Sequence, residues 1–232
     1  MTLLEVSSID VHYGDFQALW SVTLEVAASK TVAIIGANGA GKSTLLRTVA
    51  GALRPSAGSV RYDGRDISRL PAHTRARMGI ALVPEGRKLF PSLTVEENLQ
   101  IGAFARRPGP WSLRHIYELF PFVADRRHRN AHQLSGGEQQ AVAIGRALMG
   151  NPRLLLVDEL SLGLAPIIVQ RLYEVLPSIT AAGTAVLLVE QDIGRAVAAA
   201  DHVKCLLEGR VTLEGRPADL DRATVRAAYF GI

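Results

Sequence analysis

Short apolar runs rich in β-branched residues recur along the chain and alternate with longer amphipathic stretches. Strand-like runs cover Leu4–Tyr13, Val22–Val26, Thr31–Gly36, Ser59–Tyr62, Ile80–Pro84, Leu154–Asp158, Ala185–Glu190 and Lys204–Glu208. Helical patterns begin at Lys42, Val95, Gly137, Pro166 and Asp192. Strands that alternate with helices predict an α/β fold with a mostly parallel sheet and helices on both faces. Antiparallel hairpins near each end of the chain are expected to make that sheet mixed.

The segment from residue 86 to residue 151 contains no strand-like run and predicts helices joined by loops. We therefore expect a single domain in which residues 1–85 and 152–232 form the α/β core. Residues 86–151 are then an inserted helical subdomain. No internal repeat and no sustained heptad pattern interrupts this organisation.

Length and composition agree with an ordinary globular protein. The 232 residues suffice for a large core, with 48% hydrophobic and 21% charged residues. No apolar run approaches the ~18 residues that cross a bilayer, and the N-terminal residues do not predict a secretory signal. The single Cys205 cannot form an internal disulfide, and we expect it to be a small buried side chain.

The chain carries a net charge of +4, which raises the question of a nucleic-acid partner. Its basic residues are spread along the sequence, apart from the short cluster Arg126–Arg129. A cluster this small predicts a solvated face, so we expect no nucleic acid as a partner.

Residues 36–43 match the eight-position P-loop pattern, and the match follows a β-rich run and opens a helix. Glycines let backbone N–H groups turn around a β-phosphate, and the helix N-terminus adds a favourable field. We expect Lys42 to bridge the β- and γ-phosphates and Ser43 to ligate Mg²⁺. The nucleotide-binding residues predicted here are Gly36, Ala37, Asn38, Gly39, Ala40, Gly41, Lys42, Ser43 and Thr44.

Two carboxylates, Asp158 and Glu159, follow the apolar run of residues 154–157. Ligands of open α/β sheets lie at the carboxyl ends of the strands, and the upstream P-loop supplies the ligand. Asp158 is therefore predicted to hold Mg²⁺ through its hydration shell, and Glu159 to polarise the attacking water as general base. The alternative is a pair of surface acids that close a strand.

Residues 134–140, Leu-Ser-Gly-Gly-Glu-Gln-Gln, precede another predicted helix. A helix N-terminus after Ser-Gly-Gly is a second anion site, with free N–H groups and the Ser135 hydroxyl. Because the P-loop already provides one such site, the second indicates a contact with the nucleotide of another subunit.

With these three motifs in this order and spacing, the chain resembles the ATP-binding-cassette (ABC) ATPases over essentially its whole length. Residues 134–138 match the LSGGQ signature of that family except at Glu138. The resemblance implies a head-to-tail dimer with a sister ATPase subunit, in which Ser135, Gly136, Gly137 and Glu138 close on the partner's ATP. It also implies that Tyr13 stacks on adenine; a core or surface aromatic is the alternative.

Several positions depart from the common pattern of the family. Glu85 stands where most members carry a Gln that joins the metal site to the transmembrane partner, and Gln191 stands where a His usually contacts the γ-phosphate. Leu160 and Ala165 replace a Pro and an Asp. We interpret Glu85 as a metal-site residue and Gln191 as a hydrogen-bond donor to the γ-phosphate. The alternative is that Gln191 caps the turn leading into Asp192.

The segments VPEGR, SLGLAP and VEQD and the terminal Tyr-Phe-Gly resemble the second ATPase of branched-chain amino acid importers, with cousins serving urea and short amides. The resemblance implies Mg²⁺-dependent ATP hydrolysis at the cytoplasmic face of the inner or plasma membrane. Its expected partners are permease subunits, with a solute-binding protein involved only indirectly.

Two alternatives lie outside transport. One is a chromosome-maintenance ABC ATPase, which conflicts with the spacing of only about 90 residues between Ser43 and Ser135 and with the missing heptads. The other is a regulatory ATPase without a membrane partner.

Overall fold

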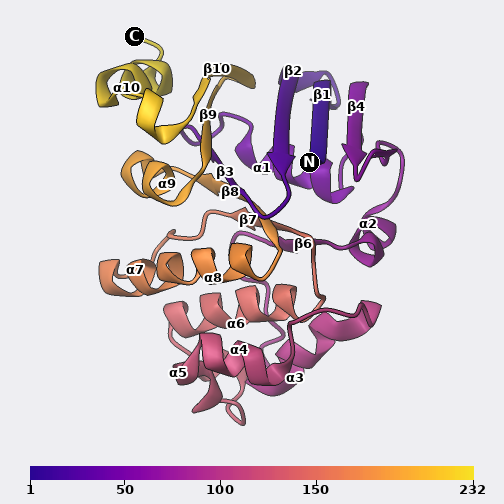
Figure 1. Cartoon of the computed structure of the whole chain (residues 1–232), viewed down its shortest axis with the longest axis vertical. Helices are drawn as coiled ribbons and strands as arrows, with labels where there is room; N and C mark the ends of the chain where they lie inside the picture. The colour runs from indigo at the N-terminus through magenta and orange to yellow at the C-terminus, as the bar shows by residue number, and fades with distance from the viewer.

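The computed structural model describes all residues from 1 to 232 and contains two sheets (Figure 1). The larger sheet has six strands in the order β10-β9-β3-β8-β7-β6. All neighbours pair in parallel except β10 with β9. Its strands are β3 (Thr31–Ile35), β6 (Ile80–Val83), β7 (Leu154–Asp158), β8 (Ala185–Glu190), β9 (His202–Leu207) and β10 (Arg210–Gly215).

The second sheet is antiparallel, with the strand order β2-β1-β4-β5. Its strands are β1 (Thr2–Tyr13), β2 (Phe16–Ala27), β4 (Ala57–Tyr62) and β5 (Arg65–Asp66). The fold class is confirmed, but the N-terminal hairpin forms its own sheet where the sequence predicted a single mixed one. In β2, buried positions alternate with exposed ones, whereas β3, β7 and β8 are buried throughout. Only the latter pattern suits a sheet covered on both faces.

The core helices lie between and around the sheets. They are α1 (Lys42–Ala50), α2 (Ala72–Met78), α7 (Pro166–Glu174), α8 (Leu176–Ala181), α9 (Ile193–Ala199) and α10 (Arg222–Phe230), with the 3₁₀ turn η3 (Pro217–Asp219). Leu45 and Leu46 of α1 join one hydrophobic cluster with β1, β2 and alternate residues of β7. Helices α9 and α10 pack on β3 and β9, where Cys205 is buried as predicted. The antiparallel hairpin expected near the C-terminus is confirmed as β9–β10, whereas the hydrophobic pattern did not predict β5, α2 or α10.

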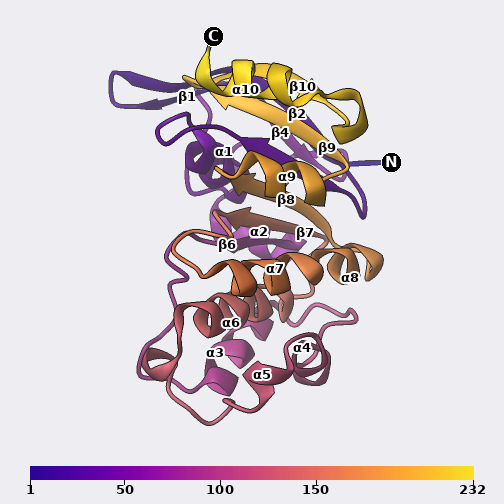
Figure 2. The ribbon, with the colours of Figure 1, turned by 90° about the vertical axis from the view of Figure 1, so that its left-hand side faces the viewer.

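Residues 86–151 form helices and loops at one end of the molecule (Figures 1 and 2). They comprise α3 (Val95–Ile101), η1 (Gly102–Ala105), α4 (Leu113–Leu119), α5 (Pro121–Ala124), η2 (Ala131–Gln133) and α6 (Gly136–Leu148). Their apolar side chains join a second cluster with Leu155 and Val157 of β7. Helices α1 and α6 therefore cover opposite faces of this strand. Across the whole chain, no helix combines the length and apolar character that a membrane span requires.

Candidate active site

The loop between β3 and α1 fits tightly against the β9–β10 hairpin. A Cβ atom on Gly36 would lie 2.3 Å from the Leu206 carbonyl oxygen, so only glycine fits there. Gly41 adopts φ of 102° just before α1, a conformation that glycine reaches without strain. The Gly209 N–H donates to the Ala40 carbonyl over 3.0 Å. The β9–β10 hairpin therefore packs against the loop that precedes α1 and holds it in place.

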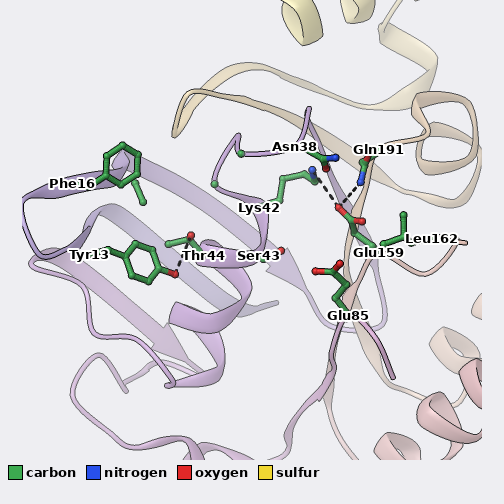
Figure 3. Close-up of a pocket in the computed structure, with 13 residues that line it drawn as sticks. Tyr13, Phe16, Asn38, Lys42, Ser43, Thr44, Glu85, Glu159, Leu162 and Gln191 are labelled. Atoms are coloured by element: carbon green, nitrogen blue, oxygen red, sulfur yellow. Dashed lines mark hydrogen bonds and ion pairs between the residues drawn. The ribbon is translucent and has the colours of Figure 1, made fainter. Parts of the chain in front are cut away.

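Lys42 lies at the first position of α1 and is 4% exposed. Its Nζ donates to the carbonyl oxygens of Gly36 (2.8 Å) and Ala37 (3.0 Å) and lies 3.6 Å from Glu159 Oε1 (Figure 3). Burial lowers the pKa of Lys42, while the carboxylates of Glu159 and Asp158 oppose that change. The ammonium group is therefore held at the loop, where anionic oxygens would meet it.

Glu159 follows β7 in a left-handed conformation with φ of 52°. Its backbone N–H donates to the Val189 carbonyl over 3.0 Å, and its Oε1 accepts a 2.8 Å hydrogen bond from Gln191 Nε2 (Figure 3). The interpretation of Gln191 as a helix cap is wrong, because the Asp192 side chain caps α9. The Gln191 amide, directly after β8, instead donates to the carboxylate of Glu159, directly after the neighbouring strand β7.

Ser43, the residue after Lys42, contacts Asp158 at the end of β7. Ser43 Oγ donates to Asp158 Oδ1 over 2.9 Å, and Asp158 is 4% exposed, which excludes the alternative of a surface acid there. Burial raises the pKa of Asp158; the Ser43 hydrogen bond opposes this, and the charges of Glu159 and Glu85 add to it. The Glu85 side chain enters the same cavity from the end of β6 (Figure 3).

These oxygen atoms suit Mg²⁺, which prefers hydroxyl, carboxylate, phosphate and water ligands. The chain holds no group of three or more His, Cys, Asp or Glu side chains that could enclose a metal by themselves. A magnesium ion that keeps several waters and shares phosphate oxygens needs only one or two protein ligands. Ser43 and Asp158 therefore fit an ion that arrives with a nucleotide.

Most of the predicted P-loop residues, with Tyr13, Glu85, Glu159 and Gln191, line one cavity of about 450 Å³, whereas Asp158 and the signature residues are not part of its lining. Tyr13 is 42% exposed, and its hydroxyl lies 3.4 Å from Thr44 Oγ1. Phe16, at 69% exposure, lines the same cavity and was missed by the sequence analysis, as were Ala18 and Leu162. The available signal for Phe16 was an aromatic residue directly after the Gly14 turn. The full lining is Tyr13, Phe16, Ala18, Asn38, Gly39, Gly41, Lys42, Ser43, Thr44, Glu85, Glu159, Leu162 and Gln191.

Residues 19–161 match the family model described as ABC transporter. The chain belongs to the ABC transporter family. It is 45% identical over 232 residues to the high-affinity branched-chain amino acid transport ATP-binding protein BraG of Pseudomonas aeruginosa, covering 99% of this chain and 100% of the relative. The prediction of an ATP-hydrolysing transporter subunit is thereby confirmed.

Solved ABC cassettes share the fold. A nucleotide-free ATP-binding cassette from an ABC transporter superposes with a TM-score of 0.85 and 26% identity, over 100% of this chain and 96% of the other. A dimeric bacterial ABC transporter cassette matches with a TM-score of 0.81 and 26% identity, over 93% and 99% of the two chains.

The segment that resembles the ABC signature opens α6 and does not line the cavity of its own subunit. Ser135 Oγ accepts from the Glu138 N–H (3.3 Å), while Glu138 Oε2 accepts from the Ser135 N–H (2.8 Å). Arg126 Nε donates to Glu138 Oε1 over 3.2 Å. Burial acts to raise the pKa of Glu138, but the Ser135 and Arg126 contacts outweigh it and lower that pKa. Glu138 therefore organises the helix start, with Gly136 and Gly137 beside an exposed Ser135.

Proposed function

We propose that this chain hydrolyses ATP to drive a branched-chain amino acid importer. The observation that carries the enzymatic part is the convergence of Lys42, Glu159 and Gln191 beside the Ser43–Asp158 pair. The amino acid part is supported by the relative from Pseudomonas aeruginosa, whose whole length this chain matches. A urea or short-amide importer is the alternative solute class.

Each group around the cavity has a distinct proposed role. Lys42 and the loop N–H groups bind the β- and γ-phosphates, and Tyr13 stacks on adenine. Ser43 and Asp158, with Glu85 nearby, would hold Mg²⁺, which would supply positive charge to the phosphate oxygens. Glu159 accepts the proton of the attacking water. Gln191 donates a hydrogen bond at the γ-phosphate and orients the Glu159 carboxylate.

One cavity contains only part of this machinery. Ser135, Gly136, Gly137 and Glu138 lie outside it, so we propose that they complete the site of a sister ATPase subunit in a head-to-tail dimer. The dimeric cassette with the same fold supports this arrangement. Because ATP would contact both subunits only in the closed dimer, its binding favours closure.

We propose that closure of the dimer is transmitted to transmembrane permease subunits. The chain would then lie peripherally at the cytoplasmic face of the membrane and contact a solute-binding protein only indirectly. A regulatory or DNA-maintenance ATPase would lack such partners, and purification of intact complexes from detergent extracts distinguishes these classes.

Two substitutions test the enzymatic roles. Lys42→Ala should weaken ATP binding, because Lys42 meets phosphate charge in the ground state. Glu159→Gln should retain binding, stop hydrolysis and accumulate closed dimers, because Glu159 acts on the attacking water. Binding of a fluorescent ATP analogue and phosphate release measure the two properties separately. Unchanged turnover in Glu159→Gln would remove Glu159 from the mechanism.

Solute uptake tests the transport assignment. Cells carrying the wild-type transporter should accumulate labelled leucine, whereas cells with Glu159→Gln should not. Uptake of urea or acetamide that depends on Glu159, without leucine uptake, would favour the alternative solute class.

A further inference from the structure

A buried carboxylate that has no part in the proposed chemistry lies at the end of β8. Glu190 is 1% exposed and directly precedes Gln191. Burying a carboxylate is unfavourable unless hydrogen bonds compensate for the lost water. Glu190 accepts three of them: from Ser161 N (3.1 Å), Ser161 Oγ (2.9 Å) and Gln191 N (3.2 Å). Two of the three come from a single residue in the loop after Glu159.

That loop begins with a strained backbone. For a residue other than glycine, the left-handed conformation of Glu159 costs roughly 1–2 kcal/mol. Such a conformation persists only where the surrounding structure determines it. Here residues at the end of β8 contact the loop both at Glu159 and beyond it. Val189 and Gln191 bind the backbone N–H and the carboxylate of Glu159, and Glu190 binds Ser161 two residues later.

The two hydrogen bonds from Ser161 to Glu190 restrain both the position and the orientation of Ser161. Because one carboxylate accepts from both the backbone N–H and the hydroxyl of Ser161, it fixes the orientation of that residue as well as its position. Glu159 and Ser161 are separated by a single residue, Leu160, which is buried in the core. The backbone from which the Glu159 side chain extends is therefore held on both sides, by Val189 and by Glu190.

We propose that Glu190 is a positioning residue for hydrolysis: by holding Ser161, it keeps the Glu159 carboxylate directed at the attacking water. This inference rests on the proposed role of Glu159 as general base. A displacement of about 1 Å between reacting groups can lower a rate by roughly a hundredfold. ATP binding depends on Lys42 and the phosphate loop, which Glu190 does not touch, and so should be spared.

The test compares Ser161→Ala and Glu190→Gln in the assembled transporter. Ser161→Ala removes one hydrogen bond and should lower kcat about threefold. Glu190→Gln places an amide N–H₂ group, which cannot accept a hydrogen bond, opposite one of the two Ser161 donors, and should lower kcat by roughly ten- to a hundredfold. Binding of a non-hydrolysable ATP analogue with Mg²⁺ should change less than about twofold in both. The double variant should be no slower than Glu190→Gln alone, because both changes act on one contact.

Glu174→Gln is the matched control. Glu174 is an exposed acid on α7 that accepts from Gln170 Nε2 over 3.0 Å, and it does not line the nucleotide cavity. Its turnover and analogue binding should equal those of the wild type. If Glu190→Gln fails to fold, Ser161→Ala decides the question, since Ser161 is only partly buried and keeps its backbone hydrogen bond.

The outcomes separate this inference from the proposed function. Wild-type kcat in Ser161→Ala and Glu190→Gln, with hydrolysis abolished in Glu159→Gln, would overturn the positioning role alone. Parallel loss of analogue binding and turnover would also overturn it, because that pattern indicates general disruption. Unchanged hydrolysis in Glu159→Gln would instead refute the role of Glu159 on which the inference rests.

Discussion

Replacement of Gln191 by Ala removes the side-chain donor to the Glu159 carboxylate, a hydrogen bond of 2.8 Å. Hydrogen bonds to charged groups contribute about 1.5–3 kcal/mol. Because Gln191 is partly exposed at the cavity wall, the lower end of that range applies. A loss of about 1.4 kcal/mol corresponds to a tenfold change in rate. We therefore expect Gln191→Ala to lower kcat about tenfold.

ATP affinity should change little in this variant. The proposed contact of Gln191 with the γ-phosphate strengthens in the transition state, and its contact with Glu159 orients that carboxylate toward the water, so their loss raises the barrier without weakening the ground state. Gln191→His should retain or increase turnover. An imidazole can donate the same hydrogen bond to the γ-phosphate, and its protonated form would add positive charge at that phosphate.

Single-turnover and steady-state hydrolysis by the assembled complex, beside binding of a fluorescent ATP analogue, measure both quantities. Gln170→Ala is a suitable control, because this exposed glutamine on α7 bonds only to the side chain of Glu174. Equal rates in wild type and Gln191→Ala would leave Gln191 with a structural role alone. A raised KM at constant kcat would place its contact in the ground state and refute the reasoning.

Three further predictions concern assembly and stability. Specific ATPase activity of the isolated chain should rise with protein concentration, since a sister signature completes each site; a flat dilution series would indicate a self-contained site. Gly36→Ala should lower stability by about 1–3 kcal/mol in chemical denaturation and weaken ATP binding, because its Cβ meets the Leu206 carbonyl. Asp201→Asn should destabilise the chain by about 1 kcal/mol at neutral pH, as it weakens the contacts to Lys30 Nζ and Thr31 N. Burial alone would raise the pKa of Asp201, but the hydrogen bonds from Lys30 and Thr31 outweigh burial and lower that pKa. The stabilisation by Asp201 is therefore complete above the ordinary pKa of about 3.9 and is lost as pH falls through the pKa of the folded state. Denaturation curves from pH 7 to pH 3 measure this loss, and a stability difference between wild type and Asp201→Asn that does not change with pH would contradict the prediction.

The positions of the main site residues follow from local sequence. A continuous glycine-rich loop places Lys42 and Ser43 at the start of a helix, and an apolar strand delivers Asp158 and Glu159 to the same sheet edge. Parallel pairing of β3, β8 and β7 then brings these segments together. Pattern and topology therefore suffice to predict which residues meet, although their roles stay predictions.

Contacts between distant segments could not be predicted in the same way. Arg75 is fully buried and donates to the carbonyl oxygens of Thr48 and Val49, and burial lowers its pKa to about 10. Nothing in the exposed, irregular pattern of residues 72–78 distinguishes this arginine from its neighbours. The Glu190–Ser161 contact likewise joins residues 29 positions apart, which only the register of β7 and β8 brings together.

Lys42 is bound by two carbonyl oxygens of its own loop and faces Glu159 at 3.6 Å. If Lys42 binds the γ-phosphate as proposed, that phosphate has to compete with these partners for the ammonium group. The Glu159 carboxylate then keeps the neutral Gln191 amide as its hydrogen-bond donor. A neutral donor orients a general base without adding a fixed positive charge beside it. The glutamine at position 191 therefore suits a site in which Lys42 faces the Glu159 carboxylate and is also the proposed ligand of the phosphate.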